Sequence, residues 1–362
     1  MLGNELSRKG KTMNKHPMRV ISPAPRDVWQ VLFRADDEAV PYQHPDWFDS
    51  LCRAGHYQDI SRMYQTEDGR QFILPLVRHR GIPLFLNPAA SMPEAWGMGG
   101  LVGAMNVRPS DIRLVFEDLA KLPYPSISIR PNPRLAALWA VAVPQSVLVI
   151  PRRAHVLDLQ GRFEQIWRTK FNHQTRTAVR KAEREGVVVE RDTTGRLVPV
   201  FYDLLRCSFD RWACKQHEPR FLTHFRGHLR DPLKKFQLVA KTMGEAMRIW
   251  LAWVNGLPAA AILVLQYGNV NVPRAAMNRD ITGTTCAGVL LHKMAIEEAC
   301  KAGCRYYHLG ESGDSVSLAQ FKERFGAVAY PYAEYHIERL PITPLEHRLR
   351  SLVKKAIGFK DV

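Results

Sequence analysis

The residues whose types and spacing point most directly to chemistry lie near the C-terminal end of the chain. The sequence reads YHLGES over residues 307–312 and FKERFG over residues 321–326. Phe321 and Phe325 are four residues apart, so they share one face of a helix and anchor it, while Lys322 leaves on a neighbouring face. The packing of the two phenylalanines then fixes the position of the lysine ammonium group, and nothing else in the sequence points so directly to chemistry. Taken alone, the pattern also fits an ordinary capped helix whose lysine is solvated.

The elements around Lys322 follow from short local signals. Residues 318–325 are predicted to form two helical turns, with Ser317 as the N-cap and Gly326 as the left-handed stop. Residues 305–309 are predicted to form the preceding strand. Gly310 permits either a sharp turn or a close approach of the backbone to a ligand. Lys322 therefore follows a strand that breaks at a glycine.

A second candidate is a row of basic residues on one long helix, predicted over residues 163–185. His173, Arg176, Arg180 and Arg184 recur every three or four residues and share a face of that helix. Guanidinium groups fit phosphate oxygens, so Arg176, Arg180 and Arg184 could bind phosphates of a substrate. The alternative is a solvated basic face.

Other motifs give less. The segment GTTCAG at residues 283–288 could place a helix N-terminus against an anion, or it could be a plain turn into a helix. Neither a P-loop nor a dinucleotide-binding glycine pattern occurs, and no serine or cysteine lies in a nucleophile motif. The six cysteines form no Cys-x-x-Cys pair and have no histidine at zinc spacing, which predicts a reduced setting and no structural metal.

The charge pattern predicts affinity for polyanions. Lys and Arg number 51 against 35 Asp and Glu, a net charge of +16, and three segments each carry +4: residues 1–19, 162–186 and 345–360. Nucleic acid, a phosphorylated substrate and an anionic membrane face are all compatible with this excess, and charge alone does not choose among them. No segment has the pattern of a signal peptide or of a membrane-spanning helix.

Strands that alternate with helices predict an α/β or α+β fold with a mixed sheet in each half. In the first half, we expect helices over residues 45–54 and 111–122, and strands over residues 60–64, 71–78 and 126–130. In the second half, we further expect helices over residues 198–215 and 287–302, and strands over residues 156–159, 187–191, 238–242, 249–254 and 259–267.

Three blocks, in this order, resemble the FemAB-like branch of the GNAT acyltransferases. They read HPDWFDSL…DGRQFILPLVRHR, then LDLQGRFEQIWRTKFNHQTRTAVRKAEREGVVV, then GVLLHKMAIEEACKAGCRYYHLGES…FKERFGA. The similarity extends from about residue 28 to residue 338, and the closing FKxxFG is its most specific part. It implies two tandem GNAT-like lobes, each a mixed sheet flanked by helices, with a substrate channel between them.

The resemblance also implies roles for individual residues. Well-studied relatives transfer an amino acid from aminoacyl-tRNA to the amine of a peptidoglycan precursor, and others act in polysaccharide or exopolysaccharide pathways. The lysine at the position of Lys322, beside Phe321, is implied to stabilise the charge that develops on the donor carbonyl. The attacking amine must also lose a proton, for which His308, Glu311 and Asp280 are the candidate bases.

One departure from the wider superfamily concerns the donor. Acetyl-CoA-dependent GNAT enzymes carry a Q/R-x-x-G-x-G/A loop before their main helix, whereas this chain has RDITGTT at residues 279–285. That mismatch weakens acetyl-CoA as the donor, although FemAB-like relatives generally lack the loop. We expect no tightly bound cofactor, and a co-substrate that is either aminoacyl-tRNA or an acyl thioester on CoA or a carrier.

Four regions are expected along the chain: a disordered segment 1–18, a first lobe 19–150, a second lobe 151–340 with the catalytic motif, and a basic amphipathic C-terminal helix 341–362. This last helix could pack on the body of the protein. Alternatively, residues 344–357 could dock on an anionic membrane face, which would suit a lipid-linked acceptor. The expected location is cytoplasmic, and peripheral on the inner membrane face if the helix docks.

Together these features predict an N-acyltransferase that moves an acyl or aminoacyl group to an amine of a cell-envelope or polysaccharide precursor. The alternative is a non-catalytic protein that binds nucleic acid or a membrane surface and retains the fold as a scaffold. The sequence does not specify the acyl group, the acceptor or the oligomeric state.

Overall fold

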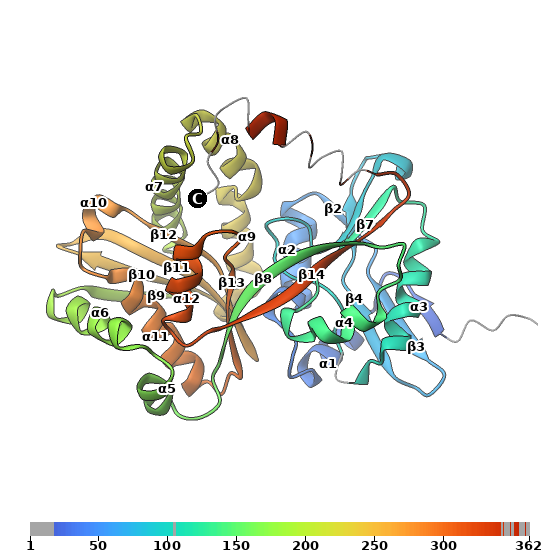
Figure 1. Ribbon diagram of the computed structural model, residues 1–362, viewed down its shortest axis with the longest axis horizontal. Helices are drawn as coiled ribbons and strands as arrows, with labels where there is room; N and C mark the ends of the chain where they lie inside the picture. The colour runs from blue at the N-terminus through green and yellow to red at the C-terminus, as the bar shows by residue number, and fades with distance from the viewer. Residues whose placement is uncertain are drawn as a thin grey trace, which may run out of the picture.

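Two lobes lie side by side and share one large mixed sheet that runs through both of them (Figure 1). The computed structural model describes residues 18–103, 106–341, 343, 348, 351–354 and 359. The first lobe contains helices α1 to α4 and strands β1 to β7, and the second contains α5 to α12 and β8 to β14. The expected α/β architecture of two lobes, each with helices against a sheet, is confirmed.

The helices cover the faces of the sheet. In the first lobe they are α1 (Arg26–Ala35), α2 (Pro45–Ala54), α3 (Pro109–Ala120) and α4 (Ala136–Ala142), with the 3₁₀ turns η1 (Pro41–Gln43), η2 (Leu84–Leu86) and η4 (Pro133–Leu135). In the second lobe they are α5 (Phe163–Thr169), α6 (His173–Arg184), α7 (Val198–Gln216), α8 (Arg220–Arg230), α9 (Leu233–Met243), η5 (Gly244–Ala246), α10 (Arg279–Thr282), α11 (Ala287–Lys301) and α12 (Val316–Glu323).

The large sheet has eleven strands. In spatial order they are β2 (Tyr57–Asp59), β5 (Val77–His79), β6 (Ala89–Ser91), β7 (Ser126–Ile129), β14 (Val328–Glu338), β8 (Leu148–Asp158), β13 (Tyr306–Glu311), β12 (Asn269–Met277), β11 (Leu257–Tyr267), β10 (Met247–Val254) and β9 (Val188–Asp192). A small antiparallel sheet in the first lobe consists of β1 (Met18–Ile21), β3 (Arg62–Thr66) and β4 (Gln71–Leu74).

Strands β8 and β14 join the lobes and cross the middle of the molecule (Figure 1). They pair antiparallel from Val328↔Val156 to His336↔Leu148, and β14 also pairs with β7 from Tyr335↔Ile129. A strand from the end of the chain therefore lies between β7 and β8, which follow each other in sequence. The largest apolar cluster contains Trp29 of the first lobe and Phe201 of the second, so side chains as well as backbone hold the lobes together.

Strands β12 and β13 run parallel but separate early. They pair only at Val270↔Tyr307 and Asn271↔His308, after which β12 follows β11 and β13 follows β8. The register of β13 on β8 shifts between His308 and Gly310, where Gly310 has a φ of +76°. A glycine accepts this left-handed conformation at little cost, so the end of β13 can turn away from its neighbour.

Several sequence-based expectations are wrong in ways that have a local cause. The helix expected over residues 163–185 is two helices, because Asn172 accepts a hydrogen bond from the Thr175 amide and so starts α6 anew. Residues 238–242, expected as a strand, belong to α9, which Pro232 precedes and whose buried side chains Phe236, Val239, Ala240 and Met243 recur at helical spacing.

Other boundaries also shift. The N-cap of α12 is Ser315 and not Ser317, and Met18, expected to be disordered, begins β1. The strand expected over residues 71–78 is interrupted, and the one expected over residues 60–64 begins at Arg62. The segment expected to be disordered and most of the expected C-terminal helix lie outside the described residues. Within the part of the chain that is described, no helix combines the length and apolar character that crossing a bilayer requires.

Candidate active site

Lys322 lies in α12 with its ammonium group against the end of β13. Its side chain is buried, and Nζ donates hydrogen bonds to the carbonyl oxygens of Gly310 at 2.9 Å and Glu311 at 2.7 Å. These carbonyls belong to the stretch of β13 that has already separated from β12. An ammonium group has three N–H donors, so one remains for a further acceptor at the split between the two parallel strands.

Burial lowers the pKa of Lys322 to about 8, although the negative charge of Glu311 opposes this. Among the described residues, no carboxylate lies within ion-pair distance of Nζ. Two imidazoles lie close enough for the lysine charge to act on them. The pKa of His292 is lowered to about 3 by burial and by Lys322, and that of His155 is lowered for the same reasons. Lys322 is therefore a partly desolvated cation among neutral rings.

The FKxxFG motif has a packing explanation. Phe321 and Phe325 contact each other with ring centroids 5.3 Å apart, and both contact the ring of His292. Gly326 has a φ of +84°, and a Cβ placed there would lie 2.6 Å from Cβ and the carbonyl oxygen of Lys170. The glycine thus ends the motif where only a residue without a side chain fits. These contacts fix α12, and with it the position of Lys322.

A polar network lies beside the end of β13, on strands β8 and β14. The hydroxyl of Tyr332 donates a hydrogen bond to the carboxylate of Glu311, and Arg152 lies 3.9 Å from that carboxylate. Arg152 and Arg130 both bind Glu334, at 2.6 and 2.9 Å. Burial would raise the pKa of Glu334, but the two arginines and the ring of His336, whose Nε2 lies 3.3 Å from a Glu334 oxygen, hold it well below its ordinary value. Tyr332 and Arg152 thus orient the carboxylate of Glu311, and the carboxylate of Glu334 is paired with Arg130 and Arg152.

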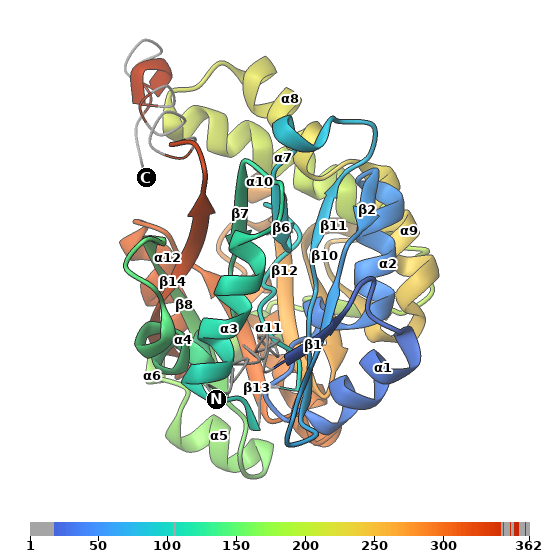
Figure 2. The same ribbon diagram turned by 90° about the vertical axis from the view of Figure 1, so that its right-hand side faces the viewer.

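The three candidate bases have very different surroundings. His308 is buried, has no hydrogen-bond partner in the described part of the protein, and burial lowers its pKa to about 3. A group with so low a pKa is a poor proton acceptor near neutral pH. Asp280 is exposed in α10, which lies apart from α12 in both views (Figures 1 and 2). Glu311 alone of the three lies next to the groups that hold Lys322.

The arginine row is separate from this site. The Arg176 guanidinium donates hydrogen bonds to the carbonyl oxygens of Arg168 and Phe171 at the end of α5, so it caps that helix. Arg180 and Arg184 are exposed on α6. Arg176 and Arg180 line an open groove of about 610 Å³, together with Phe163, Glu164, Trp167, Arg168, Glu183, Lys293 and Glu297. Since three acidic residues lie among the four basic ones there, the groove is less strongly positive than the spacing of the arginines suggests.

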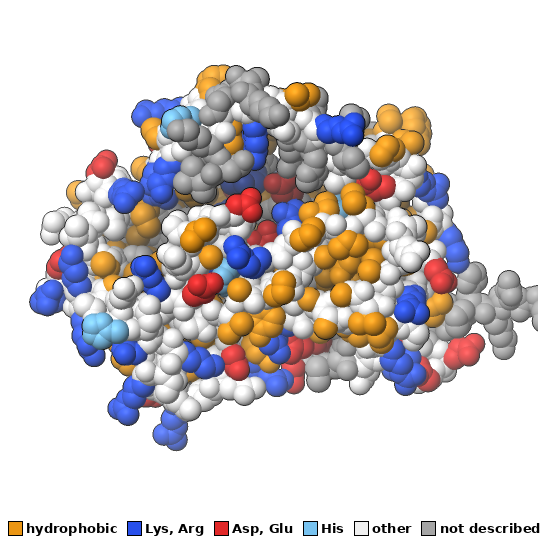
Figure 3. Space-filling model, in the orientation of Figure 1, with side chains coloured by type: hydrophobic (Ala, Val, Ile, Leu, Met, Phe, Trp, Pro, Cys, Tyr) orange, Lys and Arg blue, Asp and Glu red, His pale blue; other side chains and the backbone are white. Residues whose placement is uncertain are grey.

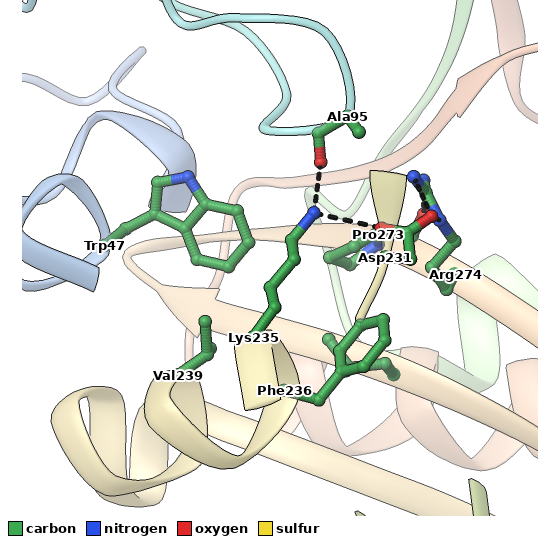
Figure 4. A pocket seen from close by; sticks show the side chains of 9 residues that line it. Trp47, Ala95, Asp231, Lys235, Phe236, Val239, Pro273 and Arg274 are labelled. Atoms are coloured by element: carbon green, nitrogen blue, oxygen red, sulfur yellow. Dashed lines mark hydrogen bonds and ion pairs between the residues drawn. The ribbon is translucent and has the colours of Figure 1, made fainter. Parts of the chain in front are cut away.

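A second buried lysine lies between the lobes. Nζ of Lys235 donates to Asp231 at 2.9 Å and to the Ala95 carbonyl oxygen at 2.7 Å (Figure 4). It also lies 4.3 Å from the centroid of the Trp96 ring. Asp231 also binds Arg274 at 2.7 Å. Burial would raise the pKa of Asp231, but the charges of Arg274, Lys235 and Arg230 hold it at about 2.

The first lobe reaches this region through Tyr42 of η1. Burial raises the pKa of its hydroxyl, and the charges of Arg274, Asp231 and Glu311 all act on it. Tyr42 is therefore within electrostatic reach of both the Lys235 cluster and Glu311 at the end of β13. In the orientation of Figure 1, the space-filling view of Figure 3 shows a recess near the middle of the molecule in which acidic and basic side chains lie.

The structure brings together Lys322, Phe321, Glu311 and Gly310, which the sequence analysis named as site residues, with polar partners that it did not name. The sequence did hold a pattern that could have identified Tyr332 and Glu334 as partners. Every second residue of one strand is polar or aromatic, namely Tyr330, Tyr332, Glu334 and His336, and such residues share a face of the strand. No local signal could connect Asp231 to Arg274, since they belong to different elements far apart in sequence.

Residues 169–323 match the family model described as "Acetyltransferase (GNAT) domain". The match spans less than half of the chain and includes α12 with Lys322. The sequence matches none of the curated proteins with which it was compared.

Solved structures extend the fold similarity over nearly the whole chain. FemX aligns with a TM-score of 0.64 and 12% identity, over 93% of this chain and 100% of FemX. A conserved protein of unknown function from Bacteroides thetaiotaomicron aligns with a TM-score of 0.55 and 12% identity, over 88% and 98%. The C-terminal domain of a putative lysylphosphatidylglycerol synthetase from Agrobacterium fabrum aligns with a TM-score of 0.52 and 14% identity, over 92% of this chain and 96% of that domain. The resemblance to FemAB-like GNAT proteins is confirmed at the level of fold.

Proposed function

We propose that this protein is an N-acyltransferase that moves an acyl or aminoacyl group from an activated donor to an amine of a cell-envelope or polysaccharide precursor. The observation that carries the proposal is the buried ammonium group of Lys322, with one donor left, at the split between β12 and β13 of a GNAT domain. Neutral surroundings strengthen a charge-assisted hydrogen bond, because the local dielectric is low.

The reaction follows from this placement. The amine nitrogen attacks the carbonyl carbon of an ester or thioester, and the carbonyl oxygen takes up negative charge as the new C–N bond forms. The remaining N–H of Lys322 donates to that oxygen. The intermediate then expels the alcohol or thiol, the C–O or C–S bond breaks, and the proton lost by the amine ends on the leaving group. Glu311, which Tyr332 and Arg152 orient, is the carboxylate that would carry this proton.

Two donor classes fit this chemistry. The net charge of +16 supports aminoacyl-tRNA, to which Arg180 and Arg184 would contribute phosphate contacts from α6. An acyl thioester on CoA or a carrier is the other class. For the acceptor, the similarity to FemX and to a domain named for lysylphosphatidylglycerol synthesis supports an envelope or lipid-linked amine. Contact of residues 344–357 with the membrane would bring the protein to such an acceptor.

The test combines both donor classes with acceptors of the proposed kind. Purified protein is incubated with aminoacyl-tRNA carrying a radiolabelled amino acid, or with acyl-CoA, in the presence of a peptidoglycan precursor that has a free amine. Mass spectrometry then looks for an acceptor whose mass has increased by the acyl group. We expect transfer from one donor class, and Lys322→Met should lower its rate by about 10²–10³-fold.

The matched control is Lys241→Met, which removes an exposed lysine on α9. Its transfer rate should equal that of the unmodified protein. A Lys322→Met variant that is folded and transfers at the normal rate would exclude the catalytic role of Lys322. If neither the unmodified protein nor either variant consumes a donor of either class, the protein would instead be a binding scaffold.

A further inference from the structure

Helix α8 has its apolar residues on the outside. Phe221, Phe225 and Leu229 recur every four residues, so they form one stripe, and they are 71%, 61% and 70% exposed. The residues that face the body of the protein are small: Thr223 and Gly227 are buried. A Cβ at Gly227 would lie 2.5 Å from the ring of Phe209 in α7. Close packing on α7 therefore fixes α8 with its large apolar side chains directed away from the protein.

A second exposed apolar element lies in the first lobe. In the loop at η2, Ile82, Leu84, Phe85 and Leu86 are 39%, 43%, 69% and 62% exposed. The buried side chain of Asn87 holds the base of this loop, since its amide nitrogen donates to the carbonyl oxygens of His79 at 2.7 Å and Ile82 at 3.1 Å. The loop is thus a formed structure that presents its apolar side chains.

Both elements lie at the same end of the molecule. In the two views, which share a vertical axis, α8 and the loop between β5 and β6 are at the top (Figures 1 and 2). Figure 3 shows hydrophobic side chains along this upper edge. Leu352 and Val353, near the C-terminal end of the chain, are also exposed, by 64% and 52%. Exposed apolar groups gathered from distant parts of a chain indicate a surface that has a partner.

The charged residues beside the exposed apolar side chains favour one kind of partner over another. Helix α8 contains no acidic residue, although Arg226 pairs with Glu218 just before the helix and Arg230 with Asp231 just after it. Arg220 of α8, and Arg78 and Arg80 in residues 78–88, which also lack an acidic residue, have no ion pair within the described part of the chain. A second copy of the chain would bring these like charges together. An anionic lipid surface instead offers apolar depth to the phenylalanines and leucines and negative headgroups to the arginines.

We propose that α8 and the 82–86 loop form a membrane-docking face that binds the surface of an anionic bilayer, with Phe221, Phe225, Leu84 and Phe85 entering the headgroup region. This contact is independent of the proposed chemistry. It also adds to the expectation for residues 344–357, because it rests on different elements. Asp231, which follows Arg230 directly, belongs to the Lys235 cluster, so the docking face borders that cluster between the lobes.

The experiment is co-sedimentation of the full chain with vesicles of phosphatidylcholine alone or with added phosphatidylglycerol, at low and high salt. We expect binding to the anionic vesicles that weakens with salt. The double variants Phe221→Ser/Phe225→Ser and Leu84→Ser/Phe85→Ser should each weaken it by more than about 10-fold. The control Val31→Ser/Val188→Ser changes two equally exposed residues, 66% and 64%, away from this face and should bind normally.

Three results would overturn the proposal. The first is an unmodified protein that binds neither kind of vesicle. The second is normal binding by both serine double variants, with loss of binding only after removal of residues 344–362, which would assign the contact to the C-terminal segment. The third is a dimer, seen by light scattering, that the double variants convert to monomer, which would assign the face to a second copy of the chain.

Discussion

The two buried lysines of this protein, Lys322 and Lys235, have similar electrostatics and opposite surroundings. Burial lowers the pKa of each to about 8. Lys235 has a carboxylate partner in Asp231, a carbonyl partner in Ala95 and an aromatic face in Trp96. Within the described residues, Lys322 has only the carbonyl oxygens of Gly310 and Glu311 as partners.

The difference separates a structural cation from one available for chemistry. The N–H donors of Lys235 are satisfied by groups from both lobes. Its ammonium group therefore links α9 to the first lobe, and no N–H donor is left for a ligand. Lys322 retains a donor and lacks a bound counterion, which is the state that a developing oxyanion can use. A lowered pKa by itself therefore does not distinguish the two roles, whereas the list of acceptors does.

The largest expected effect comes from Lys235→Met. It removes one member of a buried ion pair and leaves Asp231 with fewer cations, which should lower the free energy of unfolding by about 3–5 kcal/mol. Urea unfolding followed by tryptophan fluorescence measures this. Lys322→Met should lower it far less, because it leaves no buried carboxylate without its partner. Equal losses for the two variants would remove the distinction drawn between the two lysines.

A smaller loss of stability is expected from Gly326→Ala. The alanine must adopt a φ of +84° and fit beside Lys170, which should cost about 1–3 kcal/mol. Because α12 ends at this contact, the transfer rate should also fall as Lys322 moves. Gly256→Ala is the matched control, since Gly256 has a φ of +76° but nothing within 4 Å of the added Cβ. If it cost as much as Gly326→Ala, the contact with Lys170 would have no special role.

The smallest effect concerns pH. If the protonated Lys322 assists transfer, the rate should be halved near pH 8 and fall about tenfold by pH 9. The folded pKa lies below the unfolded value of 10.5, so between pH 8 and 10.5 the unfolded chain holds more protons and the free energy of unfolding rises with pH. Stability and rate should thus change in opposite directions. A rate that stays constant to pH 9 would contradict a role for the charged lysine.

The sequence predicted the environment of Lys322 well because its signals are local. Phe321, Phe325 and Gly326 lie within one helical turn of the lysine, and the structure assigns each of them a packing role. The α/β class followed from alternating elements for the same reason. His308 shows the limit of such reasoning, since its type suggested a base, but only the structure shows it buried without a hydrogen-bond partner among the described residues.

The parts of the site that could not be predicted from the sequence are those formed by contacts between distant segments. The acidic and aromatic face of β14 becomes part of the site only because β14 pairs beside β8, whose Arg152 binds Glu334. In the same way, nothing near Phe221 and Phe225 in sequence reveals that Gly227 packs on Phe209 and turns them outward. Helical periodicity predicts a stripe but not which face meets the protein.

The insertion of β14 between β7 and β8 also has a consequence for how the protein is made. The ribosome releases residues 126–158 long before residues 328–338, so during synthesis β7 and β8 both present an edge with no neighbour. Neither lobe can complete its sheet until residues 328–338 have emerged. Until then the nascent protein is exposed to unwanted strand pairing, and β14 then closes both lobes at once.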